Sequence, residues 1–176
     1  MTASNLEFPN PSEYDTFYAG YISCVTESDV LSVLHRQQAE IPEMLKELSE
    51  EDFDRRYDSR KWSLKEVIGH LIDTERLFSF RALCIARGET QSLPGFDQDD
   101  YVKAGLFETR TSKSLLAEYG AVRESSIQLF ENLDPTAWSR TGLANQVTFS
   151  VRAIAFIIAG HEAHHIEVVK NRYLAT

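Results

Sequence analysis

The stretch Gly160–His165, GHEAHH, decides how the chain is interpreted. It lies in an apolar segment, about 150–173, whose inward positions recur every three or four residues, and this predicts a helix. His161 and His165 are four residues apart, so their imidazoles would project from one helix face about 6 Å apart. Two imidazoles at this spacing can chelate one divalent ion. His164 would project in another direction and is not expected to share that site.

A third histidine, His70, lies on the apolar face of a second predicted helix, about 63–87. Ser63 and Glu66 form a capping box at its start. A lone inward histidine is more often a hydrogen-bonded core residue, and this remains the alternative for each of the three. Three inward histidines on two helices of one small domain favour a metal ion, since bundles build such sites from facing helices. Three ligands would leave coordination positions open for water or substrate.

Two further segments carry helical periodicity. The first, about 28–49, contains Pro42, which is expected to kink or split the helix. The second, about 112–133, is followed by Asp134-Pro135, which is typical of a cap and the first position of a short extra turn. Residues 146–149 could form a short extended entry to the last helix. Four helices of about 20 to 25 residues predict an all-α four-helix bundle.

The 176 residues are expected to form a single domain, 1–176, with the bundle over 28–174. Residues 1–25 lack a helical period but are rich in aromatic side chains, so we expect an ordered arm that packs across the bundle. The link between the second and third helices, 89–111, is long and rich in aromatic and acidic residues. Long connections in compact domains are often functional.

Composition limits the partners. Eighteen basic against 27 acidic residues give a net charge of −9, which argues against nucleic acid or an anionic membrane as a partner. The longest apolar stretch, 153–160, is far shorter than the ~20 residues that span a bilayer. No signal peptide is visible near the start. Cys24 and Cys84 fit neither a disulfide framework nor a cysteine metal site, so we expect a cytoplasmic protein.

Two motifs make a family resemblance specific. The pattern Trp62-Ser63-x-x-Glu66-x-x-x-His70-Leu71, followed about 90 residues later by GHEAHH, resembles the DinB-like superfamily with its YfiT-like proteins. The resemblance covers nearly the whole chain, and 95–102 and 13–22 resemble one uncharacterised branch. It implies a four-helix bundle that binds one divalent ion through His70, His161 and His165, with His164 outside the ligand set.

The resemblance says less about the reaction, because relatives include hydrolase-like proteins, thiol-S-transferases that use bacillithiol and mycothiol-dependent isomerases. We therefore expect a hydrolase or a thiol-S-transferase acting on a small molecule; a metal-binding or ligand-binding protein of a stress response is the alternative. Imidazole ligands suit zinc or nickel first, with iron, manganese or copper as alternatives. A low-molecular-weight thiol is a candidate cofactor. The sequence leaves open whether the chain forms a homodimer.

Other residues could assist the histidines. A ligating imidazole usually donates its second N–H to a carboxylate or carbonyl. Asp73 could accept this bond from His70, whereas Glu162 and Glu167 are expected to face away from the site. The alternative for each is a solvated helix charge. Arg81, on the inner side of the second helix, would pair with an acid of the 97–100 loop or anchor an anionic substrate.

The aromatic residues of the link are candidates for the substrate pocket. The link is long enough to fold back alongside the metal site, where Phe96, Tyr101 and Phe107 could line an apolar pocket. The alternative is that these rings only cover the core. The acidic run 97–100 lacks the glycine and glutamate spacing of a calcium loop. Neither cysteine is expected to be a nucleophile, because neither lies in an electropositive setting.

Overall fold

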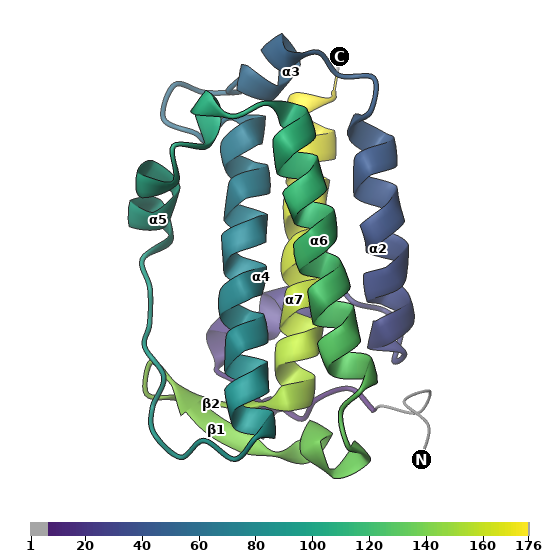
Figure 1. Cartoon of the computed structure of the whole chain (residues 1–176), viewed down its shortest axis with the longest axis vertical. Coiled ribbons are helices and arrows are strands. Elements are labelled where there is room, and N and C mark those ends of the chain that lie inside the picture. The colour runs from purple at the N-terminus through teal and green to yellow at the C-terminus, as the bar shows by residue number, and fades with distance from the viewer. Residues whose placement is uncertain (1–6, 176) are drawn as a thin grey trace.

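The computed structural model describes residues 7–175, and so the first six residues of the predicted arm and Thr176 lie outside the described residues. Four long helices form the bundle in Figure 1, which confirms the predicted fold class. They are α2 (Val30–Leu45), α4 (Leu64–Ala86), α6 (Ser112–Glu131) and α7 (Val151–Val168), the last continuing into a wider helical turn, Val169–Tyr173. Among the described residues, no helix is both long and apolar enough to cross a bilayer.

The helices do not alternate in direction. In Figure 1, α2 and α7 run one way while α4 and α6 run the other, so α4 and α6 are parallel neighbours. Two side-chain pairs agree with parallel directions for α4 and α6. Arg76 pairs with Glu118, and further along both helices Ser79 pairs with Ser126. Parallel neighbours need a connection that returns over the full helix length. This requirement explains the long link between them.

The link folds back along α4, as the sequence predicted. It carries the short helix α5 (Gln98–Gly105) on the outer side of α4 (Figure 1). Near its end, the ring of Phe107 lies directly against Gly69 of α4, where an added Cβ would be 2.3 Å from the ring. The missing side chain of Gly69 therefore lets the Phe107 ring pack against the backbone of α4.

Helix ends follow their capping residues. The capping box of Ser63 and Glu66 starts α4, and Gly88, at φ +87°, follows its end. The first predicted helix was too long, because α2 ends at Leu45 and a new helix, α3 (Glu50–Asp54), begins after its own cap, Ser49. Pro42 does not split the helix, which continues through it for three more residues.

A β-hairpin adds the only strands among residues 7–175. β1 (Thr141–Ala144) pairs antiparallel with β2 (Val147–Ser150), around a turn in which Asn145 and Gln146 both have positive φ. The extended entry to α7 was predicted, but β1 was not. Two backbone hydrogen bonds join Leu93 of the link to this hairpin, so the hairpin anchors the beginning of the link.

The described part of the N-terminal arm, residues 7–25, packs on α7, as predicted. It contains the short helix α1 (Ala19–Ile22), and the carbonyl oxygen of Tyr21 would be 1.9 Å from a Cβ on Gly160. Nearer the N-terminus of the arm, Glu13 accepts hydrogen bonds from Arg152 and Ser150 at the start of α7. Burial alone would raise the pKa of Glu13, but these bonds lower it to about 2. The arm therefore contacts α7 at two points, Glu13 and Tyr21.

Candidate metal centre

Three histidines meet where the first part of α4 faces the last part of α7. His70 comes from α4, and His161 and His165 from successive turns of α7. One nitrogen of each ring lies within 4.8 Å of the others, and the Nε2 atoms of His70 and His161 are 3.0 Å apart. Nitrogen ligands of a tetrahedral zinc ion lie about 3.3 Å apart, given bonds of about 2.0–2.1 Å. The geometry therefore fits a single ion after small side-chain adjustments.

Burial keeps the three imidazoles neutral, which is the state that binds metals. His70 is 3% exposed and His161 is 8% exposed. Desolvation lowers the pKa of His70 to about 4 and that of His165 to about 3, and it lowers the pKa of His161 well below its usual value. At neutral pH the site presents three uncharged nitrogen donors.

Thr74, one helical turn after His70, orients the His70 ring. Its Oγ1 lies 3.3 Å from His70 Nδ1, so a proton on Nδ1 can be donated to the hydroxyl while Nε2 stays free for an ion. Asp73 was the expected partner. Its side chain lies instead among Arg76, Arg110 and Glu118, and burial raises its pKa there. A hydroxyl partner was not expected, because carboxylates and carbonyls are the usual acceptors for a ligating imidazole.

Aromatic rings flank the three histidines. Trp62, just before α4, lies 4.8 Å from the ring centre of His70, and its carbonyl oxygen accepts a hydrogen bond from Tyr173. Tyr21 of the arm lies 5.2 Å from the ring of His161. His164 is exposed, and its ring lies 5.4 Å from that of Tyr21. Ring surfaces from two distant segments therefore border the imidazoles.

Glu162 does not join the histidine cluster, but it is no solvated helix charge either, because it faces the bundle interior. It is 2% exposed, and its Oε2 accepts hydrogen bonds from Tyr119 and Arg123 of α6. Arg123 also pairs with both carboxylate oxygens of Glu75 in α4. Burial alone would lower the pKa of Arg123, but Glu162 and Glu75 raise it and keep the guanidinium charged. Desolvation raises the pKa of Glu162 to about 7.

Three further candidates lie at the link. Arg81 donates to the carbonyl oxygen of Pro94 at 2.8 Å and lies over the rings of Phe78 and Phe96. Arg81 was expected to pair with an acid of residues 97–100. It binds the backbone carbonyl of Pro94 in the link instead. The rings of Phe96 and Tyr101 pack on each other, and Tyr101 is 44% exposed. The ring and hydroxyl neighbours of the histidines described above are Trp62, Thr74 and Tyr21 of the arm.

Within residues 7–175, the three histidines form the one cluster of potential ligands that can hold an ion, and no carboxylate belongs to it. A three-imidazole site of this kind leaves coordination positions open. Fold and site together define the class: four-helix bundles with parallel central neighbours and a histidine site between two antiparallel helices.

The comparisons identify the family. The family model of the DinB superfamily matches residues 34–169, so the chain belongs to that superfamily. Among solved structures, YfiT from Bacillus subtilis matches with a TM-score of 0.73 at 16% sequence identity, over 97% of this chain and 98% of that chain. It is described as "a probable metal-dependent hydrolase with an unusual four-helix bundle topology". The likeness shows a shared fold. The curated proteins contain no match.

Proposed function

We propose that the chain is a metal-dependent enzyme that acts on a small molecule, with one divalent ion held by His70, His161 and His165. The convergence of three neutral imidazoles on one point supports this most strongly. Zinc or nickel suits the donors best, with iron, manganese or copper as alternatives. When bound, such an ion supplies Lewis acidity, which acidifies a water or a thiol and polarises a carbonyl group.

The chain's own residues bind and orient at this site. Thr74 fixes the ring of His70, while Trp62 and Tyr21 present ring surfaces beside the imidazoles. A substrate with an apolar or aromatic group next to its reacting centre fits such a border. The partner is therefore a small molecule rather than nucleic acid or a membrane. Two free cysteines suit a reducing compartment, and we place the protein in the cytoplasm.

Two reaction classes follow. Hydrolysis is the first, supported by the description of YfiT as a probable metal-dependent hydrolase. Thiol transfer to an electrophile is the second. Among the described residues, the ligand cluster consists of neutral imidazoles and contains no carboxylate, so an ion held there would keep its positive charge and stabilise a thiolate.

Turnover assays separate these classes. Protein loaded with zinc or nickel would be given esters, amides, and thiol–electrophile pairs that include bacillithiol and mycothiol. We expect turnover of one group, its loss in His161→Ala, and its retention in His164→Ala. Stoichiometric metal with no turnover of any pair would favour a non-enzymatic metal-binding or ligand-binding protein. Sedimentation of the same samples would show whether the chain forms a homodimer.

A further inference from the structure

A buried arginine joins the four long helices of the bundle. Arg123 of α6 is fully buried and makes five hydrogen bonds, as many as its guanidinium has N–H donors. Nε and Nη2 donate to the two carboxylate oxygens of Glu75 in α4, and Nη2 also donates to Oε2 of Glu162 in α7. Nη1 donates to the carbonyl oxygen of Leu34 and to the side chain of Gln37, both in α2. One side chain is thus bound to three other helices.

This ion-pair cluster, Arg123 with Glu75 and Glu162, adjoins the three histidines. Glu162 directly follows His161 in α7, and Glu75 directly follows Thr74, the residue whose hydroxyl lies against the ring of the α4 histidine. A small cavity between α4 and α7, with a volume of about 10 Å³, is lined by residues of both sets, among them Thr74, Glu75, His161 and Glu162. A cavity of this size has room for at most about one water molecule, so the cluster and the histidines lie close together.

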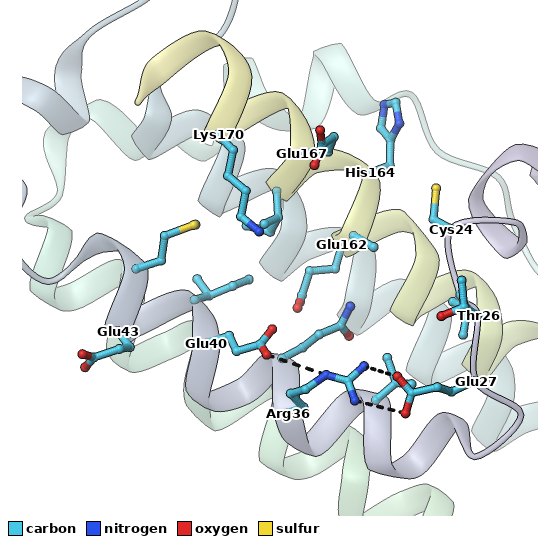
Figure 2. A pocket seen from close by; sticks show the side chains of 17 residues that line it. Cys24, Thr26, Glu27, Arg36, Glu40, Glu43, Glu162, His164, Glu167 and Lys170 are labelled. Atoms are coloured by element: carbon cyan, nitrogen blue, oxygen red, sulfur yellow. Dashed lines mark hydrogen bonds and ion pairs between the residues drawn. The ribbon is translucent and has the colours of Figure 1, made fainter. Parts of the chain in front are cut away.

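Burial fixes the contacts of the cluster. Figure 2 shows a pocket between α2 and α7, in which Glu162 points from α7 towards α2 while His164 points away from α2. Glu162 and Glu75 are 2% and 5% exposed, so neither carboxylate can exchange Arg123 for water within the fold. A buried charge that loses its partner strongly destabilises a protein. The guanidinium therefore ties α4 to α7 at the level of the histidines.

A metal centre shared by two helices depends on how those helices are spaced. α4 contributes one of the three imidazoles and α7 contributes two, so a movement of either helix changes the distances between the nitrogen donors. Ligands of a metal site must be held within about 0.5 Å of the productive geometry. We propose that Arg123 is a positioning residue of the metal centre: by binding Glu75 and Glu162 together, it sets the separation and register of the two ligand-bearing helices. The inference rests on the proposed binding of an ion by the three histidines.

Arg123→Lys tests this role, because it keeps the positive charge and changes the number and arrangement of the donors. Lysine has three donors on one nitrogen and cannot reproduce five bonds to three helices. Zinc and cobalt(II) affinities of the whole protein would be measured by competition with a chelator, and the absorption spectrum of the cobalt-loaded protein would report the coordination geometry. We expect both affinities to fall at least about tenfold and the cobalt absorption bands to shift.

Ile127→Ala is the matched control for a loss of stability. Ile127 lies one turn after Arg123 in α6 and is fully buried among apolar side chains, so its truncation should lower the melting temperature without altering the ion-pair cluster. Both metal affinities and the cobalt spectrum should then match those of the wild type. Equal changes in Ile127→Ala and Arg123→Lys, or wild-type affinity and spectrum in Arg123→Lys, would overturn the proposal.

A second variant decides if Arg123→Lys does not fold. Arg123→Met combined with Glu75→Leu and Glu162→Leu replaces all three charged groups by apolar ones of similar volume, a change that is often neutral for stability. We expect this protein to fold and to show weakened metal binding with a shifted cobalt spectrum; a wild-type spectrum would refute the role of Arg123. If the wild-type protein itself binds neither ion, the proposed metal centre fails, and this inference fails with it.

Discussion

The protonation of the three histidines predicts an unusual pH dependence of metal binding. Imidazoles with an ordinary pKa of about 6.5 would each be only about 3% neutral at pH 5. Three such ligands would together lose roughly four orders of magnitude in metal affinity between pH 7 and pH 5, because only neutral imidazole binds. Ordinary histidines would thus place the loss near pH 6.5.

In this structure the loss of metal affinity is expected at a much lower pH. Burial lowers the pKa of His70 to about 4 and that of His165 to about 3, and the pKa of His161 is also well below 6.5. All three rings therefore remain neutral at pH 5 in the folded protein. We expect zinc affinity to change less than about twofold between pH 7 and pH 5, and to fall only near pH 4.

The free energy of unfolding of the metal-free protein, unlike its zinc affinity, should change between pH 7 and pH 5. The unfolded chain binds protons at these histidines below about pH 6.5, whereas the folded chain does not. The free energy of unfolding therefore has its full value above about pH 6.5. The contribution of the neutral histidines is lost as the pH falls from about 6.5 to about 4. At pH 5, His70 and His165 would each cost about 2 kcal/mol, given 1.36 kcal/mol per pKa unit. Zinc affinity thus reports protonation of the ligands in the folded protein, whereas the stability of the metal-free protein reports protonation on unfolding.

Two measurements check this reasoning. Zinc affinity would be determined by competition with a chelator of known pH dependence at steps between pH 7 and pH 4, with circular dichroism confirming the fold at each step. Urea unfolding of the metal-free protein would be followed over the same range. A thousandfold loss of affinity centred on pH 6.5, in protein that is still folded, would show that the imidazoles are not desolvated and would refute the argument.

Three substitutions test other parts of the structure. His161→Ala and His165→Ala should each lose the bound ion, whereas His164→Ala should keep about one ion per chain; full metal content in both of the first two variants would contradict the ligand set. Thr74→Val should lower zinc affinity roughly 10-fold or more with little change in melting temperature, because the ring of the α4 histidine loses its orienting hydroxyl. Gly160→Ala should destabilise the protein by about 1–3 kcal/mol and speed proteolysis of the arm, since its Cβ would overlap the arm backbone; unchanged cleavage would disprove the close approach.

Local signals in the sequence predicted much of the fold. The helix periods and the capping box at Ser63 depend on nearby residues, and the structure confirmed them. The first strand of the hairpin was missed because its turn, Asn145-Gln146, lacks the glycine that usually marks such turns. The parallel arrangement of α4 and α6 could not be predicted, because it depends on how the helices pack. The link length indicated only that the connection could reach back.

The same limit applies to the site. The spacing of His161 and His165 is a local signal, the apolar face of the second predicted helix added His70, and the family resemblance supported the set of three. The partner of His70 was sought as a carboxylate at Asp73, whereas the structure places the Thr74 hydroxyl there. Neither Trp62 nor Tyr21 could be assigned to the site from sequence, because each comes from a segment outside the long helices.

Glu162 shows why helix periodicity alone misplaced an important residue. A helix with one buried face would turn position 162 towards solvent once His161 and His165 face inward. α7 is instead buried on several sides, because α4, the arm and α2 all pack on it. An ionisable residue on such a helix needs a buried partner, and Arg123 supplies it from α6. The stretch 160–165 therefore directs two histidines to the candidate metal centre and places Glu162 in a buried ion pair.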